Sequence, residues 1–565
     1  MSQQVTPVAS VSRLPIWPIA LWSLAVLAVL IVTIDDYAIV WDEGQYLTLE
    51  AEMRRWFALL LDGGRSAFSR AAVLDHWRFS REQPDGHPPF WAIVANAGWL
   101  VGHTWLSPLA AHRLGSAVLF AIAAGGLFRL VERHWGAVAG ATASASLVVM
   151  PRVFVHAHLN TTDATLTSLW ILAAVAFDSA RQRWSAPGAQ RERRSSSIAA
   201  WIESSVLGVL LGWAAVTKLT GWFVPIPLAA WATMRRDVAG WKALLAAGPA
   251  CVAAMYLFNP PWWHDPIGGV ALFLRENLGR RDNTLITTMF LGRVYGFDLP
   301  WYNALVWTAV TVPAGILALA AIGLLRAIAS RLSDPLATLV VLNWATLIAL
   351  RSLPGAPGHD GERQLMASFP FVACLAAYGV AGVRELLASR FGVRGASARL
   401  AEAGLIAAAL GTALAGVIRY HPVQLAYYNE IIGGISGAAR AGLEPTYFWD
   451  AMTPDMIEWL NEHSTDDDAV LFSAVPESFQ YLRRWGKLRV RLLPWEPGRR
   501  RWYVLQNRPG LFRPADRWLI EHGTPAHTRV QGGVPLVWVF TLDQYEQAIR
   551  QTQRDQPADR PAGAP

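Results

Sequence analysis

The sequence predicts a mainly α-helical polytopic membrane protein with about eleven transmembrane helices and a small C-terminal α/β domain outside the membrane. Of its 565 residues, 53% are apolar and only 16% are charged, and the mean hydropathy is +0.27. Soluble domains carry about 25% charged residues, so this chain is too apolar to be soluble throughout. Runs of about 20 mostly uncharged residues, each long enough to cross a bilayer core of roughly 30 Å, recur from residue 15 to residue 419.

The predicted spans follow one another with short loops between them. They cover residues 15–34, 112–130, 136–156, 163–178, 199–217, 220–234, 241–258, 302–325, 335–351, 364–382 and 402–419. Basic residues gather in alternate loops, for example in 181–194 and 384–399, and such loops are typically cytoplasmic. We therefore expect a cytoplasmic N-terminus and a C-terminal domain on the opposite, extracytoplasmic side.

One further apolar run, residues 88–106, is predicted to lie along the outer face as an interfacial or re-entrant helix. It starts with two prolines and contains two glycines. All the basic loops fall on one side only if this run does not cross the membrane. A twelfth span at this place is the alternative topology.

The chain divides into three predicted regions. Residues 1–419 form the transmembrane domain, with a first extracytoplasmic loop at 35–111. Residues 420–553 form the α/β domain, where the patterns predict helices near 454–463, 476–485 and 543–551 and strands near 468–474, 501–506 and 534–541. The Pro-rich end, 554–565, is predicted to be disordered.

Composition excludes several classes of function. The net charge of +7 would suit nucleic acid, but the basic residues lie in short loops between spans, as in the positive-inside pattern. We therefore expect the lipid bilayer as a partner and no nucleic acid. The two cysteines, Cys251 and Cys374, both lie in apolar spans, so neither a disulfide framework nor a thiolate zinc site is expected.

Four carboxylates follow the first span within a dozen residues, and two of them, Asp42 and Glu43, begin an amphipathic pattern over 43–60. Asp42, with Gln45 three residues later, occupies the N-cap position of this predicted surface helix, and Glu43 favours its dipole. Four acids at one exit point exceed what a single cap requires. Asp42 is therefore also a candidate catalytic base at the membrane surface, and both interpretations stay open.

Further ionisable groups fall on the same predicted outer face. They are His87 before the interfacial helix, Arg113 in the second span, Asp163 at the start of the fourth, Lys218 after the fifth and Arg363 before the tenth. Ionisable groups at membrane depth are unfavourable and usually functional. Alternatively, Arg113 and Lys218 could reach to lipid headgroups, and Asp163 could cap its helix.

Carboxylates and cations on one face suit one kind of reaction. A carboxylate can deprotonate an acceptor hydroxyl or hold a divalent cation, which is the one cofactor we consider, with no metal ligands assigned. Cationic groups can hold a lipid phosphate and stabilise the charge that it gains on leaving. A sugar on a polyprenyl phosphate fits both demands, because its phosphate is a good leaving group and one base suffices for an inverting displacement.

The order of five motifs resembles the PMT-type glycosyltransferases of the GT-C class, which include protein O-mannosyltransferases and lipid A aminoarabinose transferases. The motifs are WDEGQY, GHPPF, HRLGSAV, TTDA and TKLTG, and the later segments HDGERQLMASFP and YYNEIIGGISGAARAGLEPTYFWD resemble bacterial members. The resemblance implies a bacterial inner-membrane enzyme with a periplasmic site. It places the family's acidic pair at Asp42 and Glu43, its HPP element at His87, its outer arginine at Arg113, its second-loop aspartate at Asp163 and the lysine of the lipid A branch at Lys218.

The predicted function is transfer of a hexosyl or pentosyl group from a polyprenyl-phosphate donor to a lipid, glycan or protein acceptor. We expect Asp42 to be the base, Glu43 and Asp163 to orient the acceptor or hold a cation, and Lys218, Arg113, Arg363 and His87 to bind the donor phosphate. A transporter or flippase of a lipid-linked sugar is the main alternative. A membrane-anchored binding protein, whose acids only cap helices, is another.

Overall fold

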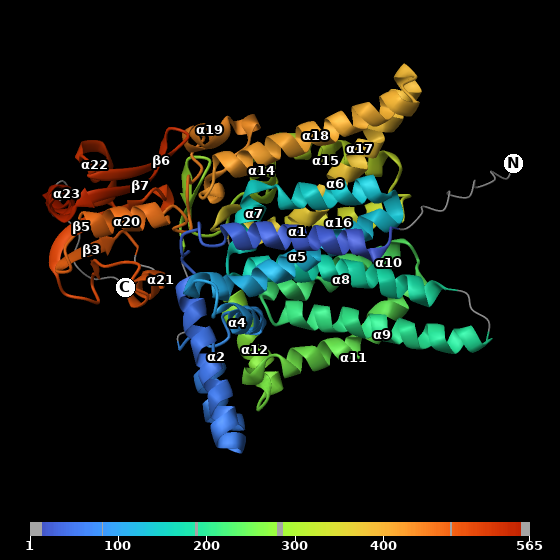
Figure 1. Cartoon of the computed structure of the whole chain (residues 1–565), viewed down its shortest axis with the longest axis horizontal. Coiled ribbons are helices and arrows are strands. Elements are labelled where there is room, and N and C mark those ends of the chain that lie inside the picture. Colours follow the sequence, from blue (N-terminus) through green and yellow to red (C-terminus); the bar gives the residue numbers. More distant parts are fainter. Residues whose placement is uncertain are drawn as a thin grey trace.

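The computed structural model describes residues 14–81, 83–186, 190–279, 286–356, 358–474 and 477–554, without the side chains of 190–196. Long helices run side by side in a bundle, and a smaller domain with a sheet lies at one end of it (Figure 1). The longest bundle helices are α1 (Ile16–Thr33), α5 (Pro108–Trp135), α8 (Thr162–Ser185), α9 (Gln190–Ala215), α11 (Val238–Leu257), α17 (Phe369–Phe391) and α18 (Gly395–Arg419).

Helices occur at every one of the predicted spans, although several are short or broken. The third span is a pair, α6 (Ala137–Val148) and α7 (Pro151–His158), bent by 72°. The eighth is interrupted before Pro313, between α14 (Asn303–Thr311) and α15 (Ala314–Ala329). By length and composition, six helices of the described chain could cross a membrane, or seven with the bent pair. The polytopic helical fold is thus confirmed.

The remaining helices of the membrane region connect these spans or cover their ends. They are α2 (Glu43–Gly63), η1 (Gly64–Phe68), α3 (Arg70–Trp77), α4 (Phe90–Gly102), η2 (Leu219–Phe223), α10 (Pro225–Met234), η3 (Pro260–Trp262), α12 (Pro266–Leu278), α16 (Pro335–Arg351) and η4 (Gly361–Ser368). A two-stranded hairpin, β1 (Thr288–Phe290) and β2 (Arg293–Tyr295), lies in a loop for which the sequence indicated no strand.

The apolar run at 88–106 forms α4, which is seen nearly end-on at the end of the bundle (Figure 1). Its 13 residues span about 20 Å at 1.5 Å per residue, less than the roughly 30 Å of a bilayer core. Its N-terminal turn is held to the end of α9, because the Phe90 amide donates to the Val216 carbonyl (3.0 Å). This helix is short for a membrane span, and its place along the outer face stays a prediction.

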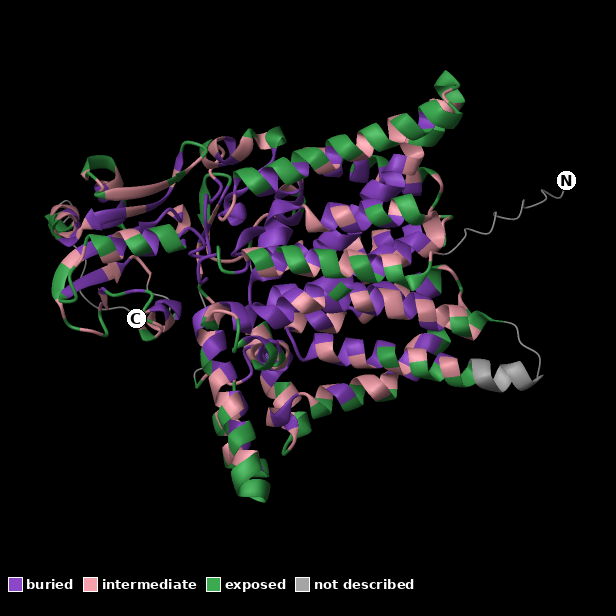
Figure 2. Cartoon of the chain, in the orientation of Figure 1, coloured by how far each residue is buried: buried purple, intermediate pink, exposed green. Residues whose placement is uncertain are grey.

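Burial separates the centre of the bundle from its rim (Figure 2). In the most apolar stretches of α5 and of the segment that contains α17, 72% and 83% of the residues are buried, against 17% in α1 and 22% in α18. α15 and α17 pack closely at Gly323 and Gly379, where an added Cβ would lie about 2 Å from a backbone carbonyl oxygen of the other helix. Small residues permit such close packing between membrane helices.

Helix α2 lies across the end of the bundle, as expected for an amphipathic surface helix (Figure 1). It buries Tyr46, Leu49, Met53 and Trp56, which recur at the helical spacing of three to four residues. Asp42 stands at the N-cap position, but its side chain makes no cap hydrogen bond. The predicted capping role of this side chain is therefore wrong.

The C-terminal domain contains a mixed five-stranded sheet in the order β4-β3-β5-β7-β6. The predicted strands are β3 (Asp468–Phe472), β5 (Arg499–Gln506) and β7 (Val534–Thr541), and the predicted helices are α20 (Pro454–Glu462), α21 (Ser478–Arg484) and α23 (Leu542–Arg554). The sequence patterns did not indicate β4 (Arg491–Leu492), β6 (His527–Gln531) or α22 (Pro514–His522). Short connecting helices η5 (Gln424–Ala426), η6 (Glu430–Ile432), α19 (Gly434–Arg440) and η7 (Pro509–Leu511) complete this part.

Residues 555–565, most of the end predicted to be disordered, lie outside the described residues.

Candidate functional site

Three of the predicted site residues form one buried cluster at the end of the bundle that faces the C-terminal domain. Lys218 Nζ donates to Asp163 Oδ1 (2.6 Å), and Arg363 Nε donates to Asp163 Oδ2 (2.6 Å). Their side chains are only 4 to 7% exposed. Lys218 also donates to Gln364 Oε1 (3.2 Å), so a residue that the sequence did not single out completes this side of the cluster.

Local structure leaves Asp163 available for these contacts. It is the second residue of α8, and the Thr161 hydroxyl accepts from the Ala164 amide (3.5 Å) as the N-cap. Lys218 lies between the end of α9 and η2, while Arg363 lies in η4 just before α17. Three helix ends that are far apart in the sequence therefore bring one carboxylate and two cations together.

Asp42 joins the cluster through its Oδ2 atom, which accepts from Arg363 Nη2 and, weakly, from the Tyr46 hydroxyl (3.4 Å). Its side chain is 20% exposed, more than any other member of the cluster. The Oδ1 atom has no hydrogen-bond partner in the described part of the chain. Asp42 thus presents one carboxylate oxygen outward while the other is held by Arg363.

The environment of Asp42 changes its acidity. Burial raises the pKa of the Asp42 carboxyl above its ordinary value, against the opposing effect of the Arg363 charge, and the nearby Asp360 and Asp163 raise it further. A carboxyl with a raised pKa binds a proton more strongly, so it is a better general base than an ordinary exposed aspartate.

The cluster continues into the C-terminal domain through Asp360 and Arg508. Arg363 Nη1 donates to Asp360 Oδ2 (3.0 Å), and Arg508 Nη2 donates to Asp360 Oδ1 (3.0 Å). Arg508 Nη1 also donates to the Tyr447 carbonyl (2.7 Å). Although burial opposes it, the Arg508 guanidinium holds the pKa of Asp360 below its ordinary value. Three carboxylates thus face three cations, and Arg508 Nε also lies 3.5 Å from Oε2 of a fourth buried carboxylate, Glu444.

Glu43 and Arg113 form a separate, fully buried ion pair. Arg113 donates from Nε to Glu43 Oε1 (2.8 Å) and from Nη2 to Glu43 Oε2 (2.7 Å). Its other donors go to the carbonyls of Ile34, Tyr37 and Ala38. All five N–H groups are therefore used, and none is left for a donor phosphate. Glu43 also accepts from the Val40 amide (3.0 Å), so the pair fixes the segment that leads to Asp42.

His87 is buried next to the cluster rather than within it. Its ring lies edge-on to Tyr46 (6.4 Å between centroids) and to Phe79 (5.1 Å). Tyr46 in turn reaches Asp42, and the Phe90–Val216 hydrogen bond places the GHPPF turn beside the Lys218 segment. Contact between His87 and a phosphate stays a prediction.

The sequence did not predict two members of the cluster, Asp360 and Arg508. Asp360 stands three residues before Arg363, and this spacing was a usable signal because the two can pair within one turn. For Arg508 the sequence held no such signal, since its partner lies 148 positions away. The same holds for Arg152, which pairs with Glu362 across 210 positions and is almost fully buried.

The expected divalent cation has a poor set of ligands here. Asp42, Asp163 and Asp360 are all paired with lysine or arginine, so side chains already supply the positive charge. In the described ranges, no group of three or more His, Cys, Asp or Glu side chains has the arrangement of a metal site. His156 and His158 also have separate partners, Tyr447 (3.4 Å) and Thr33 (2.8 Å). These residues do not fit a bound divalent cation.

The comparisons with known proteins agree with this architecture. A family model described as dolichyl-phosphate-mannose-protein mannosyltransferase matches residues 86–264. No curated protein matches the chain by sequence.

Three solved structures illustrate the similarity. Apo ArnT from Cupriavidus metallidurans has 16% identity and a TM-score of 0.50, over 93% of this chain and 98% of that chain. ArnT from the same organism bound to undecaprenyl phosphate has the same identity and coverage, with a TM-score of 0.47. The oligosaccharyltransferase AglB from Archaeoglobus fulgidus, in complex with an inhibitory peptide and a dolichol-phosphate, has 11% identity and a TM-score of 0.45, over 87% of this chain and 70% of that chain.

The apo ArnT comparison shows a shared fold over nearly the whole of both chains. The matched family segment contains the GHPPF, HRLGSAV, TTDA and TKLTG motifs. The resemblance to PMT-type glycosyltransferases is thereby confirmed over residues 86–264, and the shared fold extends over most of the chain.

Proposed function

We propose that this membrane protein transfers a sugar from a polyprenyl-phosphate donor to an acceptor on the extracytoplasmic face. The family whose model matches is described by a lipid-phosphate-linked sugar, dolichyl-phosphate mannose. The ion cluster lies at the bundle end next to the C-terminal domain, and the basic last turns of α5, α8 and α17 belong to the opposite end (Figure 1). Basic ends are typically cytoplasmic, which supports an extracytoplasmic site.

The single observation that carries the proposal is the geometry of Asp42. One of its oxygens is fixed by Arg363, the other is open, and the rest of the cluster is buried. In the proposed step, Asp42 takes the proton of an acceptor hydroxyl as that oxygen attacks the anomeric carbon. The bond from this carbon to the phosphate oxygen breaks, its electron pair stays on the phosphate, and polyprenyl phosphate leaves. A single displacement of this kind inverts the anomeric carbon.

Lys218 and Arg363 are the cations nearest to this base, and we assign the donor phosphate to their side of the cluster. Arg363 donates three of its five N–H groups to Asp42, Asp163 and Asp360. Asp163 holds both cations in place, so it orients the phosphate site rather than the acceptor. Fixed cations of this kind stabilise the charge that develops on a leaving phosphate without reorganising during the reaction.

The Asp42→Asn variant tests the assignment in purified membranes supplied with a polyprenyl-phosphate sugar donor and cell-envelope acceptor lipids. We expect transfer to fall about a hundredfold or more, the scale of a lost general base, at an unchanged protein level. Asp36→Asn is the matched control, because Asp36 lies in the same segment, is 47% exposed and pairs with His421 rather than with a member of the cluster. Full activity of Asp42→Asn would overturn the assignment, and equal losses in both variants would point to a structural defect.

A further inference from the structure

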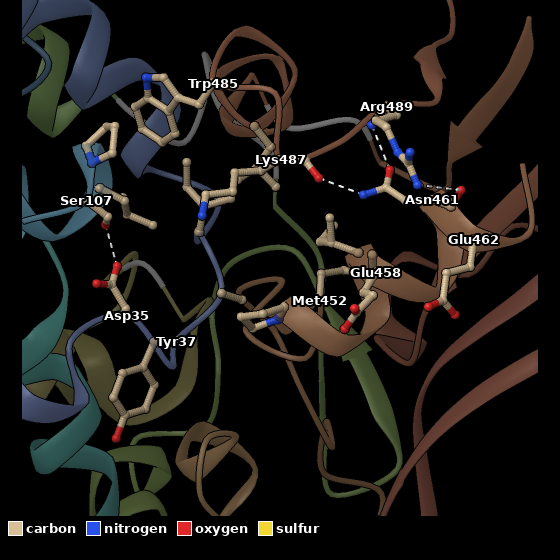
Figure 3. Close-up of a pocket in the computed structure, with 17 residues that line it drawn as sticks. Asp35, Tyr37, Ser107, Met452, Glu458, Asn461, Glu462, Trp485, Lys487 and Arg489 are labelled. Carbon is tan, nitrogen blue, oxygen red and sulfur yellow. Dashed lines mark hydrogen bonds between the residues drawn. The ribbon is translucent and has the colours of Figure 1, made fainter. Parts of the chain in front are cut away.

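A cleft of about 690 Å³ separates the rim of the helical bundle from the C-terminal domain (Figure 3). None of the four residues Asp42, Asp163, Lys218 and Arg363 lines it, so it is distinct from the ion cluster. Its size lies within the range of about 300–1,000 Å³ that is usual for ligand sites.

Both walls of the cleft are held in place by side-chain hydrogen bonds. On the bundle side, Ser107 Oγ donates to Asp35. On the domain side, Asn461 of α20 donates from Nδ2 to the Lys487 carbonyl (2.7 Å) and accepts at Oδ1 from the Arg489 amide (2.7 Å). Each wall of the cleft is therefore fixed locally.

The cleft offers polar groups that the protein itself does not use. In Figure 3 the Lys487 side chain extends into the cleft toward the wall formed by Ser107 and Asp35. Neither the Lys487 ammonium nor the Glu458 carboxylate has an ion-pair or hydrogen-bond partner among the described residues. The Trp485 indole and the Met452 side chain supply apolar surface beside them.

This mixture of groups is suited to a saccharide. Sugar hydroxyls both donate and accept hydrogen bonds, so they can pair with a carboxylate and an ammonium at once. The C–H face of a sugar ring can pack on an aromatic side chain such as Trp485. An acyl chain would leave Lys487 and Glu458 without partners.

The position of the cleft indicates where the saccharide comes from. Asp35 follows α1 by two residues, and Pro108 is the first residue of α5, so the cleft opens at the membrane boundary. The cleft also adjoins the segment that carries Asp42, which is joined to the C-terminal side by the Trp41 amide donating to the Phe448 carbonyl (3.1 Å). Ile39 lines the cleft and lies three residues before Asp42, so the two are within about 10 Å of each other.

We propose that the cleft binds the oligosaccharide headgroup of a membrane-anchored acceptor. The inference rests on the proposed function, because the sugar that Asp42 deprotonates is a further unit of the same headgroup. The cleft thus recognises sugar units of the acceptor headgroup that do not themselves receive the transferred sugar.

The test uses the full-length protein in lipid nanodiscs and an array of defined tetrasaccharides, neutral, acidic and amino-sugar. We expect a subset to be retained by the wild type and, equally, by Asp42→Asn, since that residue does not line the cleft. Trp485→Ala and Lys487→Met should each weaken retention tenfold or more. Trp495→Ala is the control, because Trp495 is an exposed tryptophan outside the cleft.

The outcomes separate this proposal from the enzymatic one. Equal retention by Lys487→Met and the wild type would overturn the saccharide site, and because Lys487 is exposed we expect this variant to fold. Failure of every tetrasaccharide to bind, with retention of peptides on a matched peptide array, would overturn it in favour of a protein acceptor. If saccharide binding depends on the cleft residues but Asp42→Asn is fully active, the saccharide site is supported. The assignment of Asp42 as the catalytic base is then overturned.

Discussion

Asp42 shows how far a single residue can be understood from its sequence neighbours. Its position before an amphipathic helix predicted a cap, and the helix is present, yet the side chain turns away to Arg363, 321 positions later in the chain. Cap patterns are local, whereas ion pairs between distant segments leave no local trace. The convergence of Asp42, Asp163, Lys218 and Arg363 on one face was nevertheless predictable, because the spans and their polarity place each of them at the same end.

The raised pKa of Asp42 predicts the pH dependence of the reaction. Below this pKa the carboxyl is protonated and cannot accept the proton of the acceptor. The rate constant kcat/KM should therefore fall about tenfold per pH unit on the acid side, with an apparent pKa above the ordinary aspartate value of about 3.9. The measurement is a pH profile of transfer in detergent-solubilised enzyme.

The residual activity of Asp42→Asn provides the control, because an amide does not titrate and the acid limb should disappear. An acid limb that persists unchanged in this variant would assign the ionisation to another group.

At the scale of elements, hydrophobic runs predicted where the helices lie. They did not predict where a span is bent or interrupted. The α6–α7 bend and the interruption between α14 and α15 both occur before a proline, Pro151 and Pro313, which cannot continue the hydrogen bonding of a preceding helix. The two strands of the five-stranded sheet that the patterns missed, β4 and β6, lie at its edges. Edge strands are often short, and they need less of the alternating pattern that a buried strand shows.

The contact between α15 and α17 should depend on the absence of side chains at its crossing point. A Cβ at Gly379 would lie 1.9 Å from the Leu319 carbonyl oxygen, so Gly379→Ala must separate the helices. We expect a lower melting temperature of the purified protein, measured by light scattering or intrinsic fluorescence. Gly248→Ala in α11 is the matched control, because nothing lies within 4 Å of its added Cβ, and it should be neutral or slightly stabilising.

Arg508 lies in the C-terminal domain, between β5 and η7, and it belongs to the ion cluster. We therefore expect this residue to affect catalysis although it lies outside the helical bundle. Arg508→Met leaves Asp360 with one cation fewer, and breaking such a buried pair costs about 3–5 kcal/mol. We expect kcat to fall at least tenfold and the acid limb of the pH profile to shift, because Asp360 and Arg363 both act on Asp42.

The exposed Arg517 of the same domain, whose guanidinium contacts the Pro509 carbonyl and the Phe512 ring, provides the control as Arg517→Met. Unchanged kinetics in a folded Arg508→Met protein would show that the contact is only structural.

At the scale of the whole molecule, the bundle has two different ends. One carries the C-terminal domain, α2, α4 and the ion cluster, and the other carries the basic ends of α5, α8 and α17 (Figure 1). The polytopic class and the helical regions were predictable from hydropathy alone. How the C-terminal domain contacts the bundle was not, because it depends on single pairs such as Trp41–Phe448 and Asp360–Arg508.

Orientation can be measured with single cysteines in a variant that lacks Cys251 and Cys374. Glu521→Cys in α22 and Thr104→Cys after α4 should react with an impermeant maleimide in intact cells. Ser389→Cys, at the basic end of α17, should react only after permeabilisation. All three positions are exposed. Labelling of Thr104→Cys with the same pattern as Ser389→Cys would instead make α4 a membrane span.

The reach of Arg508 into the ion cluster has a consequence for how the protein is made. A chain is synthesised from its N-terminus, and the partners of Arg508 in the cluster precede it by 145 positions or more. Until the ribosome has passed this residue, the nascent bundle holds one more carboxylate than cation among the six residues of the cluster. The third cation of the cluster arrives only with the C-terminal domain, so we expect a chain that stops before Arg508 to lack activity.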